Sequence, residues 1–218
     1  MAVLISGRGS NMVSLIDAVR EPDHPASIAL VVANRADAGG LARARAAGIE
    51  ALAIEHRAYS TRESFEQVLD GALRERGIDL LCLAGFMRVL TPWFVERWAG
   101  RMLNIHPSLL PLFRGTRTHE RALAEGVLIH GCTVHFVVPE LDAGPILTQA
   151  AVPVVPGDTP DTLAARVLAQ EHVIYPRALR MVCSGEAWLE NGRVVFAAGW
   201  AATQALRSPE PPWVGHRG

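Results

Sequence analysis

Short apolar runs alternate with helix-like segments through the first half of the chain, and this alternation constrains the fold more than any other feature. An almost continuously apolar run is typical of a strand in a parallel sheet that is covered on both faces. Four such runs occur, at Val3–Ser6, Ile28–Ala33, Ala51–Ile54 and Asp79–Ala84. The pattern predicts an α/β fold with a Rossmann-like, open, mostly parallel sheet and helices on both faces.

The helices between these runs have recognisable start and stop signals. The helix after the third run is predicted to have Ser60 as its cap and to end near Arg76, before Gly77. In the second half, residues 102–105, 131–137 and 145–152 are predicted strands, and a long helix follows from Thr159 to about Val182. Asn191-Gly192 predicts a hairpin turn within Trp188–Phe196.

Composition excludes several classes of function. The chain has 218 residues with 21 basic and 22 acidic side chains, and it lacks a basic patch with interleaved aromatics, so nucleic-acid binding is not expected. Its three scattered cysteines favour a reducing compartment. The first residues are too short for a signal peptide, and no apolar run is long enough to span a membrane. We therefore expect a cytoplasmic protein that does not bind a membrane.

Asn104 and His106 end one of the predicted strands, just before Pro107. Positions i and i+2 of a strand point to the same face, so the amide and the imidazole are expected side by side. This pair suits a reaction in which charge grows on a carbonyl oxygen while a proton moves. The alternative is a pair of polar side chains bonded to local backbone.

The glycine-rich loop Gly7–Asn11 lies between the first predicted strand and a helix. Exposed amides and the helix dipole make such a loop an anion site, and a small phosphate ester is the favoured ligand. The loop has no Gly-Lys-Ser/Thr and lacks the third glycine of a dinucleotide fingerprint. Alternatively, Ser10 and Asn11 only cap the helix.

Other polar residues carry weaker signals. Asp142 lies in a glycine-containing loop, where a carboxylate brought beside His106 would favour the charged imidazole and fix its orientation. The alternative is an ordinary turn aspartate. Arg88 follows a strand end and meets either an anionic ligand or solvent. The spacing of His119, His130 and His135 matches no zinc pattern, so no metal site is expected. No serine nucleophile is expected either, because Gly-x-Ser-x-Gly is absent.

Taken in order, five segments resemble the phosphoribosylglycinamide formyltransferase family, a group of folate-dependent enzymes of purine synthesis. The resemblance extends from about Val3 to Trp188, so it covers most of the chain. The segments are Ile5-Ser6-Gly7-Arg8-Gly9-Ser10-Asn11, Leu83-Ala84-Gly85-Phe86-Met87-Arg88, Leu103-Asn104-Ile105-His106-Pro107-Ser108-Leu109-Leu110-Pro111, Glu140-Leu141-Asp142-Ala143-Gly144-Pro145-Ile146 and Gln170-Glu171-His172.

The resemblance implies the formyltransferase fold and transfer of a formyl group from 10-formyltetrahydrofolate, the co-substrate, to the amine of glycinamide ribonucleotide. It implies that Asn104, His106 and Asp142 are catalytic. It also implies that glycinamide ribonucleotide is held by Gly9, Ser10, Asn11, Pro107 and Glu171. The implied folate site consists of Arg62, Met87, Arg88, Val89, Leu90, Asn104, Val138, Pro139, Glu140 and Leu141. Residues 1–190 are then the formyltransferase domain, residues 191–218 a hairpin remnant and a flexible tail, and a homodimer is left open.

Residues 111–117 depart from the family's pattern at Leu112 and Arg114, and the roles of these residues and of Arg117 stay open. The formyl donor is therefore better fixed than the acceptor. Three alternatives are weighed: a formyltetrahydrofolate deformylase, a methionyl-tRNA formyltransferase and a non-catalytic module that binds folate or nucleotide. The deformylase would carry an added amino-terminal domain, and the tRNA enzyme a basic carboxyl-terminal one.

Overall fold

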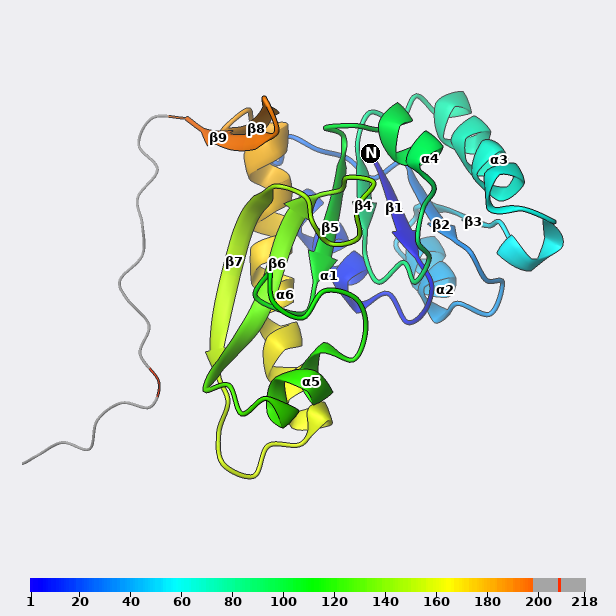
Figure 1. Cartoon of the computed structure of the whole chain (residues 1–218). Coiled ribbons are helices and arrows are strands. Elements are labelled where there is room, and N and C mark those ends of the chain that lie inside the picture. The colour runs from blue at the N-terminus through cyan, green and yellow to red at the C-terminus, as the bar shows by residue number, and fades with distance from the viewer. Residues whose placement is uncertain (198–207, 209–218) are drawn as a thin grey trace, which may run out of the picture.

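A seven-stranded sheet forms the centre of the computed structural model, which describes residues 1–197 and residue 208 (Figure 1). The strand order is β3-β2-β1-β4-β5-β6-β7. Neighbouring strands from β3 to β5 run parallel, whereas β6 runs antiparallel to both of its neighbours, β5 and β7. The strands are β1 (Ala2–Ile5), β2 (Leu30–Ala33), β3 (Glu50–Ala53), β4 (Leu81–Leu83), β5 (Met102–His106), β6 (Ile129–Phe136) and β7 (Ile146–Pro153). The prediction of an open, mostly parallel α/β sheet is confirmed.

Two apolar cores lie on opposite faces of this sheet, and the alternation of side chains along β1 separates them. Val3 and Ile5 face one core, whereas Ala2 and Leu4 face the other. The first core packs against α1 (Ser10–Val19), α2 (Gly39–Ala46), α5 (Thr118–Ala124) and α6 (Pro160–Cys183). The second packs against α3 (Arg62–Glu75) and α4 (Pro92–Arg97), which lie together on the other side of the sheet in Figure 1.

One helix boundary differs from its prediction. The residue that caps α3 is Thr61, whose hydroxyl accepts a bond from the Ser64 amide at 3.1 Å, so the prediction of Ser60 is wrong. Ser64 returns a bond to the Thr61 amide, and the two side chains form a reciprocal capping box. Ser60 lies one residue too early to reach that first turn. A short 3-10 helix (His56–Ala58) precedes this cap.

The order of the strands in the sheet indicates where a ligand site is expected. The order reverses between β1 and β4, and open α/β sheets bind ligands beside the carboxyl ends of strands at such a point. The loops after β1 and β4 are joined there, since Ser6 Oγ accepts the Met87 amide at 2.8 Å and the Ser6 amide donates to Gly85 at 3.1 Å.

The predicted hairpin is present as β8 (Ala187–Glu190) and β9 (Arg193–Phe196). Asn191 and Gly192 both have positive φ, 49° and 74°, as its tight turn requires. The predicted flexible tail lies outside the described residues. Within the described part of the chain, no helix has the length and apolarity needed to cross a membrane.

Candidate active site

The end of β5 brings polar side chains onto one face of the sheet. Met102 belongs to the core beneath α4, so Asn104 and His106, two and four residues further on, share its face. The antiparallel register pairs Asn104 with His135 and His106 with Thr133 on β6. The predicted side-by-side placement of Asn104 and His106 is therefore present, and β6 adds a second imidazole.

His106 lies between two oxygen atoms that can only accept hydrogen bonds. Its Nε2 lies 3.0 Å from the Phe113 carbonyl oxygen, and its Nδ1 lies 3.4 Å from Asp142 Oδ2. The ring is 5 % exposed, so water does not compete freely for either nitrogen. Both ring nitrogens of His106 thus face hydrogen-bond acceptors. The two contacts fix the orientation of the ring on the same face of β5 as Asn104.

His135 has the opposite surroundings. Its Nε2 accepts a hydrogen bond from Asn104 Nδ2 at 3.1 Å, and its Nδ1 donates to the Phe136 carbonyl at 3.0 Å. Burial lowers the pKa of this ring, although the Phe136 carbonyl and Asp142 oppose that change. His135 is therefore neutral, and it fixes the Asn104 amide while leaving the second N–H of that amide for another acceptor.

Asp142 reaches this cluster from the loop between β6 and β7. Its Oδ2 also accepts the Gly115 amide at 2.8 Å, so the carboxylate joins two loops over His106. The loop passes close to β6 at Gly144, where an added β-carbon would lie 1.7 Å from the Phe136 oxygen. Glycine is needed at that position because the two backbones touch.

Thr133 on β6 fixes the segment after β5 through hydrogen bonds to the backbone of Ser108 and Leu110. The Thr133 hydroxyl donates to the Ser108 carbonyl at 2.7 Å and accepts the Leu110 amide at 3.0 Å. Gln149 on β7 adds bonds to the Leu110 carbonyl and to the same hydroxyl, at 2.9 and 3.0 Å. These buried bonds fix the path that carries the Phe113 carbonyl to His106.

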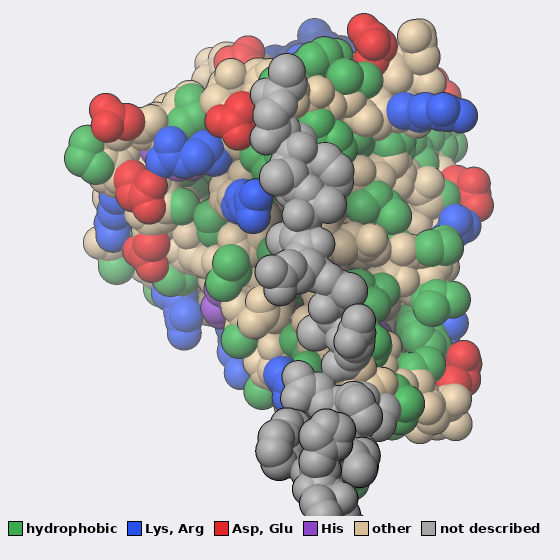
Figure 2. Space-filling model, turned by 90° about the vertical axis from the view of Figure 1, so that its left-hand side faces the viewer, with side chains coloured by type: hydrophobic (Ala, Val, Ile, Leu, Met, Phe, Trp, Pro, Cys, Tyr) green, Lys and Arg blue, Asp and Glu red, His purple; other side chains and the backbone are tan. Residues whose placement is uncertain are grey.

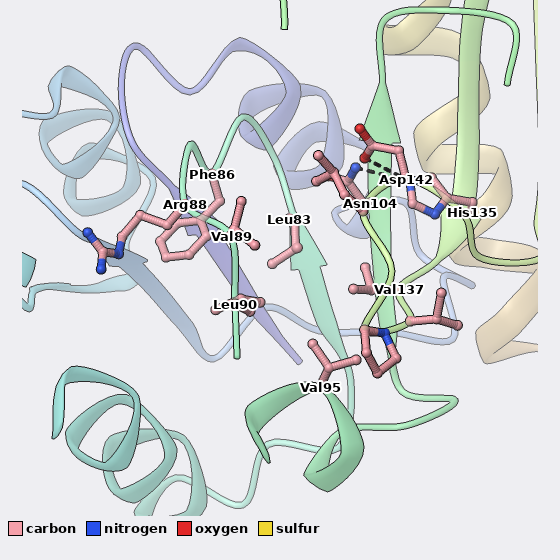
Figure 3. A pocket seen from close by; sticks show the side chains of 13 residues that line it. Leu83, Phe86, Arg88, Val89, Leu90, Val95, Asn104, His135, Val137 and Asp142 are labelled. Atoms are coloured by element: carbon pink, nitrogen blue, oxygen red, sulfur yellow. Dashed lines mark hydrogen bonds and ion pairs between the residues drawn. The ribbon is translucent and has the colours of Figure 1, made fainter. Parts of the chain in front are cut away.

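A cavity of about 90 Å³ opens beside this cluster (Figure 3). Asn104, His135 and Asp142 lie together at one end of it, and Arg88 points away at the other. Apolar side chains from β4, α4 and the loop after β6 form much of the remaining wall. Such a cavity suits a largely apolar ligand with one reactive polar end.

Most of the residues predicted to bind folate line this cavity. They are Arg88, Val89, Leu90, Asn104, Val138, Pro139 and Leu141. Three predicted residues do not line it. Met87 faces a second cavity, Arg62 is exposed at the start of α3, and Glu140 forms an ion pair with Arg114 at 2.8 Å. Arg88 is half-buried, with its guanidinium 5.2 Å from the Phe65 ring centre, so it is not a freely solvated surface arginine.

Four of the residues predicted to bind glycinamide ribonucleotide, namely Gly9, Ser10, Asn11 and Glu171, meet at the start of α1. Asn11 Nδ2 donates to Glu171 Oε2 at 2.6 Å, and both side chains are buried. Burial raises the pKa of the Glu171 carboxyl, and the Asn11 bond opposes that change. Gly9 precedes the helix with a φ of 71°, and no side chain in the described part of the chain caps α1, so the interpretation of Ser10 and Asn11 as mere caps is wrong. The backbone amides of that first turn are left for an anion. Pro107 follows β5 directly.

The divergent segment has well-defined partners. Arg114 pairs with Glu140, Arg117 pairs with Glu120, and Leu112 is 58 % exposed. Three of the non-glycine residues with positive φ lie on the two loops around His106, namely Phe113, Arg117 and Asp142 at 55°, 57° and 48°. Side chains other than glycine seldom adopt this conformation.

The sequence prediction overlooked His135, which was weighed only as a metal ligand. A usable signal existed, because Thr133 and His135 alternate with apolar residues along the predicted strand 131–137 and so share a face. Within the described residues, no group of three or more His, Cys, Asp or Glu side chains could hold a metal ion.

The fold and this cluster have a match among known families. Residues 1–179 match the formyl transferase family, and this match covers more than half of the chain. The class of the protein is thus a formyl transferase.

Individual relatives narrow that class. The chain is 44 % identical over 211 residues to phosphoribosylglycinamide formyltransferase of Escherichia coli (strain K12), covering 94 % of this chain and 99 % of that one. The solved structure of glycinamide ribonucleotide transformylase 1 from Symbiobacterium toebii superimposes with a TM-score of 0.87 at 47 % identity, covering 89 % and 92 %. The chain belongs to the phosphoribosylglycinamide formyltransferase family.

A longer relative shares the same unit. The trifunctional purine biosynthetic protein adenosine-3 of Homo sapiens is 52 % identical over 197 residues, which are 90 % of this chain and 20 % of that protein. The chain therefore spans about a fifth of the length of this relative.

Proposed function

We propose that this chain transfers the formyl group of 10-formyltetrahydrofolate to the amine of glycinamide ribonucleotide, a step of purine synthesis, in the cytoplasm. The observation that carries the proposal is the position of His106, held between a carbonyl and a carboxylate next to the Asn104 amide. Family membership and the relatives that cover most of both chains support it.

The two substrates are proposed to approach the cluster from different sides. Glycinamide ribonucleotide would lie with its phosphate on the amides of Gly9, Ser10 and Asn11 and its ribose near Glu171, beside Pro107. The folate would fill the cavity bounded by Met87–Leu90 and Val138–Leu141, with Arg62 near its acidic tail. Asn104 would then face the formyl group.

In the proposed reaction, the substrate amine attacks the formyl carbon directly and forms a new C–N bond. The carbonyl oxygen becomes negatively charged, and the free N–H of Asn104 and the His106 cation stabilise it. The carbon–nitrogen bond to the folate then breaks, the folate nitrogen gains a proton and the former amine loses one, so tetrahydrofolate leaves neutral at that atom. Asp142 holds His106 in place and balances its charge.

The experiment measures release of tetrahydrofolate from 10-formyltetrahydrofolate by the purified protein, with and without glycinamide ribonucleotide. Release that requires the ribonucleotide supports the proposal. Release without it identifies a deformylase, and no release under either condition contradicts the proposed function.

Two variants make this test specific to the site. His106→Ala should lower turnover by about 10²-fold or more, the range for loss of an acid–base group. His24→Ala, which changes a half-buried side chain in the turn before β2, should keep wild-type turnover. Equal turnover of wild type and His106→Ala would exclude the proposed role of this imidazole.

A further inference from the structure

Residues 112–115 contact the proposed catalytic side chains through backbone groups. The Phe113 carbonyl accepts a hydrogen bond from His106 Nε2 at 3.0 Å, and the Gly115 amide donates to Asp142 Oδ2 at 2.8 Å. The same two side chains lie 3.4 Å apart, measured from His106 Nδ1 to Asp142 Oδ2. The path of this short segment therefore sets how the imidazole and the carboxylate lie relative to each other.

Arg121 of α5 holds the same segment. Its Nη1 donates to the carbonyl of Arg114, which lies between the two residues that contact His106 and Asp142, at 2.7 Å. Its guanidinium also lies 5.4 Å from the centre of the Phe113 ring, a distance at which a cation attracts an aromatic face. No carboxylate in the described part of the chain forms an ion pair with Arg121, so its guanidinium serves this segment alone.

The Phe113 ring has a second partner in His130. Phe113 is 7 % exposed, and the His130 ring meets it edge-on, with 5.7 Å between the ring centres. The backbone of Phe113 has a φ of 55°, which residues other than glycine seldom adopt. The ring contacts with Arg121 and His130 oppose a return to an ordinary backbone conformation, so they keep the Phe113 carbonyl directed at His106.

These contacts also account for the positions at which the segment departs from the family's pattern. Leu112 and Arg114 take part through their carbonyl groups, and the Leu112 carbonyl accepts from Ser108 Oγ at 2.6 Å. Every residue carries a backbone carbonyl, so the side chains at these two positions are free to differ. Phe113 contributes its ring as well as its carbonyl.

We propose that Arg121 is a positioning residue for the transfer reaction and acts on His106 through Phe113. It does not line the cavity beside Asn104, so its effect passes through other residues. Without its side chain, the turn at 112–115 relaxes and the bond between His106 and the Phe113 carbonyl lengthens. This inference rests on the proposed function, because it takes His106 to act in the reaction.

The first test measures kcat and both KM values for Arg121→Ala. We expect kcat to fall about tenfold or more, since misplacing a catalytic group by about 1 Å can cost about 10²-fold. Both KM values should stay within about twofold. Arg121→Lys should recover most of the loss, because an ammonium group also donates to a carbonyl and attracts an aromatic ring. A higher KM with an unchanged kcat would overturn the inference, because Arg121 would then act in substrate binding.

Arg101 offers a closely matched control. Its Nη2 donates to the Arg97 carbonyl at 2.7 Å, and its guanidinium lies 4.9 Å from the centre of the Trp98 ring. Arg101→Ala therefore removes the same two kinds of contact, at the end of β5 opposite to His106. This variant should keep wild-type kinetics. Equal kcat values for Arg121→Ala and Arg101→Ala would contradict the proposal.

A double variant tests the route of the effect. Phe113→Leu removes the ring, retains the carbonyl and should lower kcat by a factor similar to that of Arg121→Ala. If Arg121 acts through Phe113, the double variant should lose much less than the product of the two single losses. Losses that multiply would overturn the inference, because the two residues would then act independently.

Nuclear magnetic resonance separates this inference from the proposed function. The hydrogen on His106 Nε2 is buried and bonded to a carbonyl, so it should exchange slowly with water, and its signal is assigned by its loss in His106→Ala. Arg121→Ala should raise this exchange rate about tenfold or more, whereas Arg101→Ala should not change it. If the wild type transfers no formyl group, the proposed function fails and the exchange rate still tests the positioning. An unchanged rate in Arg121→Ala overturns the inference.

Discussion

His106 and His135 lie within one cluster, yet they have different kinds of hydrogen-bond partner. His106 faces two acceptors, whereas His135 accepts from Asn104 and donates to backbone. Pairs of titratable groups with divergent environments are a common way to divide acid and base roles at neutral pH. Here His135 positions the Asn104 amide, and His106 is the ring assigned to the proposed reaction.

Replacing Asp142 by asparagine tests this division. The variant should lose about 10²-fold or more in kcat, because the imidazolium loses its counter-charge, while the KM for folate changes far less. The kcat–pH profile should also change, because the carboxylate no longer lies beside the His106 ring. Steady-state kinetics between pH 5.5 and 9 measure both effects.

The control for that prediction is Asp161→Asn, which removes an exposed carboxylate from the first turn of α6. It should leave the kinetics unchanged. If Asp142→Asn retained wild-type kcat across the pH range, the carboxylate would have no part in the reaction.

Residue-level prediction succeeded where a side chain follows strand periodicity and failed where partners come from distant strands. The i, i+2 rule places Asn104 and His106 together without knowledge of the tertiary fold. The pairing of Asn104 with His135 depends on the register of β5 and β6, which the sequence does not define. The resemblance supplied Asp142, since its own loop predicts only a turn.

At the scale of elements, the loop between β6 and β7 depends on the close approach at Gly144. Gly144→Ala would place a β-carbon 1.7 Å from the Phe136 oxygen, so the loop and Asp142 must move. We expect kcat to fall at least about tenfold and the free energy of unfolding to fall by about 2 kcal/mol or more. Urea unfolding and turnover assays measure the two effects.

A glycine in open space gives the matched control. Gly71 lies inside α3, and an added β-carbon there meets no atom within 4 Å. Gly71→Ala should stabilise the protein by about 0.5–1 kcal/mol through helix propensity. A Gly144→Ala protein as stable and active as Gly71→Ala would show that the loop can adapt.

The contact between α5 and β6 should make stability depend on pH. His130 of β6 is 1 % exposed and lies 5.2 Å from the His119 ring, centre to centre, and its ring nitrogens have no hydrogen-bond partner among the described residues. Burial, and secondarily the nearby His119, lower the pKa of His130 to about 4. In the unfolded chain this histidine is therefore protonated below about pH 6.5, whereas in the folded chain it is protonated only below about pH 4.

Stability should accordingly fall as the pH drops from 6.5 toward 4, with about 2 kcal/mol lost by pH 5 through this one group. His130→Gln should flatten that dependence, whatever its stability at pH 7.5. Urea midpoints at pH 7.5 and 5 for both proteins give the comparison. An identical drop in wild type and variant would assign the acid sensitivity to other groups.

On the scale of the whole molecule, one sheet separates two cores. A destabilising substitution in one core should therefore lower the stability of the helices packed on the other face as well. Leu163 of α6 and Leu69 of α3 are both fully buried, on opposite faces. Leu163→Ala should cost about 2–5 kcal/mol and lower protection against hydrogen exchange in α3 as much as in α6. Loss of protection in α6 alone would show that the two faces unfold separately.

The architecture was more predictable than its edges. Strands β1 to β4 and the helices between them followed from apolar runs alone, because a covered parallel sheet requires such runs. Of these strands, β1, β2 and β4 are fully buried, whereas the edge strand β3 has one buried residue. The antiparallel pairing of β6 with both β5 and β7 has no such signature. On the face in Figure 2, basic and acidic side chains are interspersed, in line with the balance of 21 basic and 22 acidic residues. The division of the chain at residue 190 stays a prediction.

The left-handed backbone at Phe113, Arg117 and Asp142 bears on how the sequence of these loops evolves. Glycine adopts this conformation without steric cost, whereas the backbone strain at each of these residues is of order 1–3 kcal/mol. Selection for stability alone would therefore favour glycine at these positions on the loops over His106. Laboratory evolution of this chain for heat resistance, without selection for turnover, should select glycine at these sites. The resulting variants should be more stable and catalytically inactive.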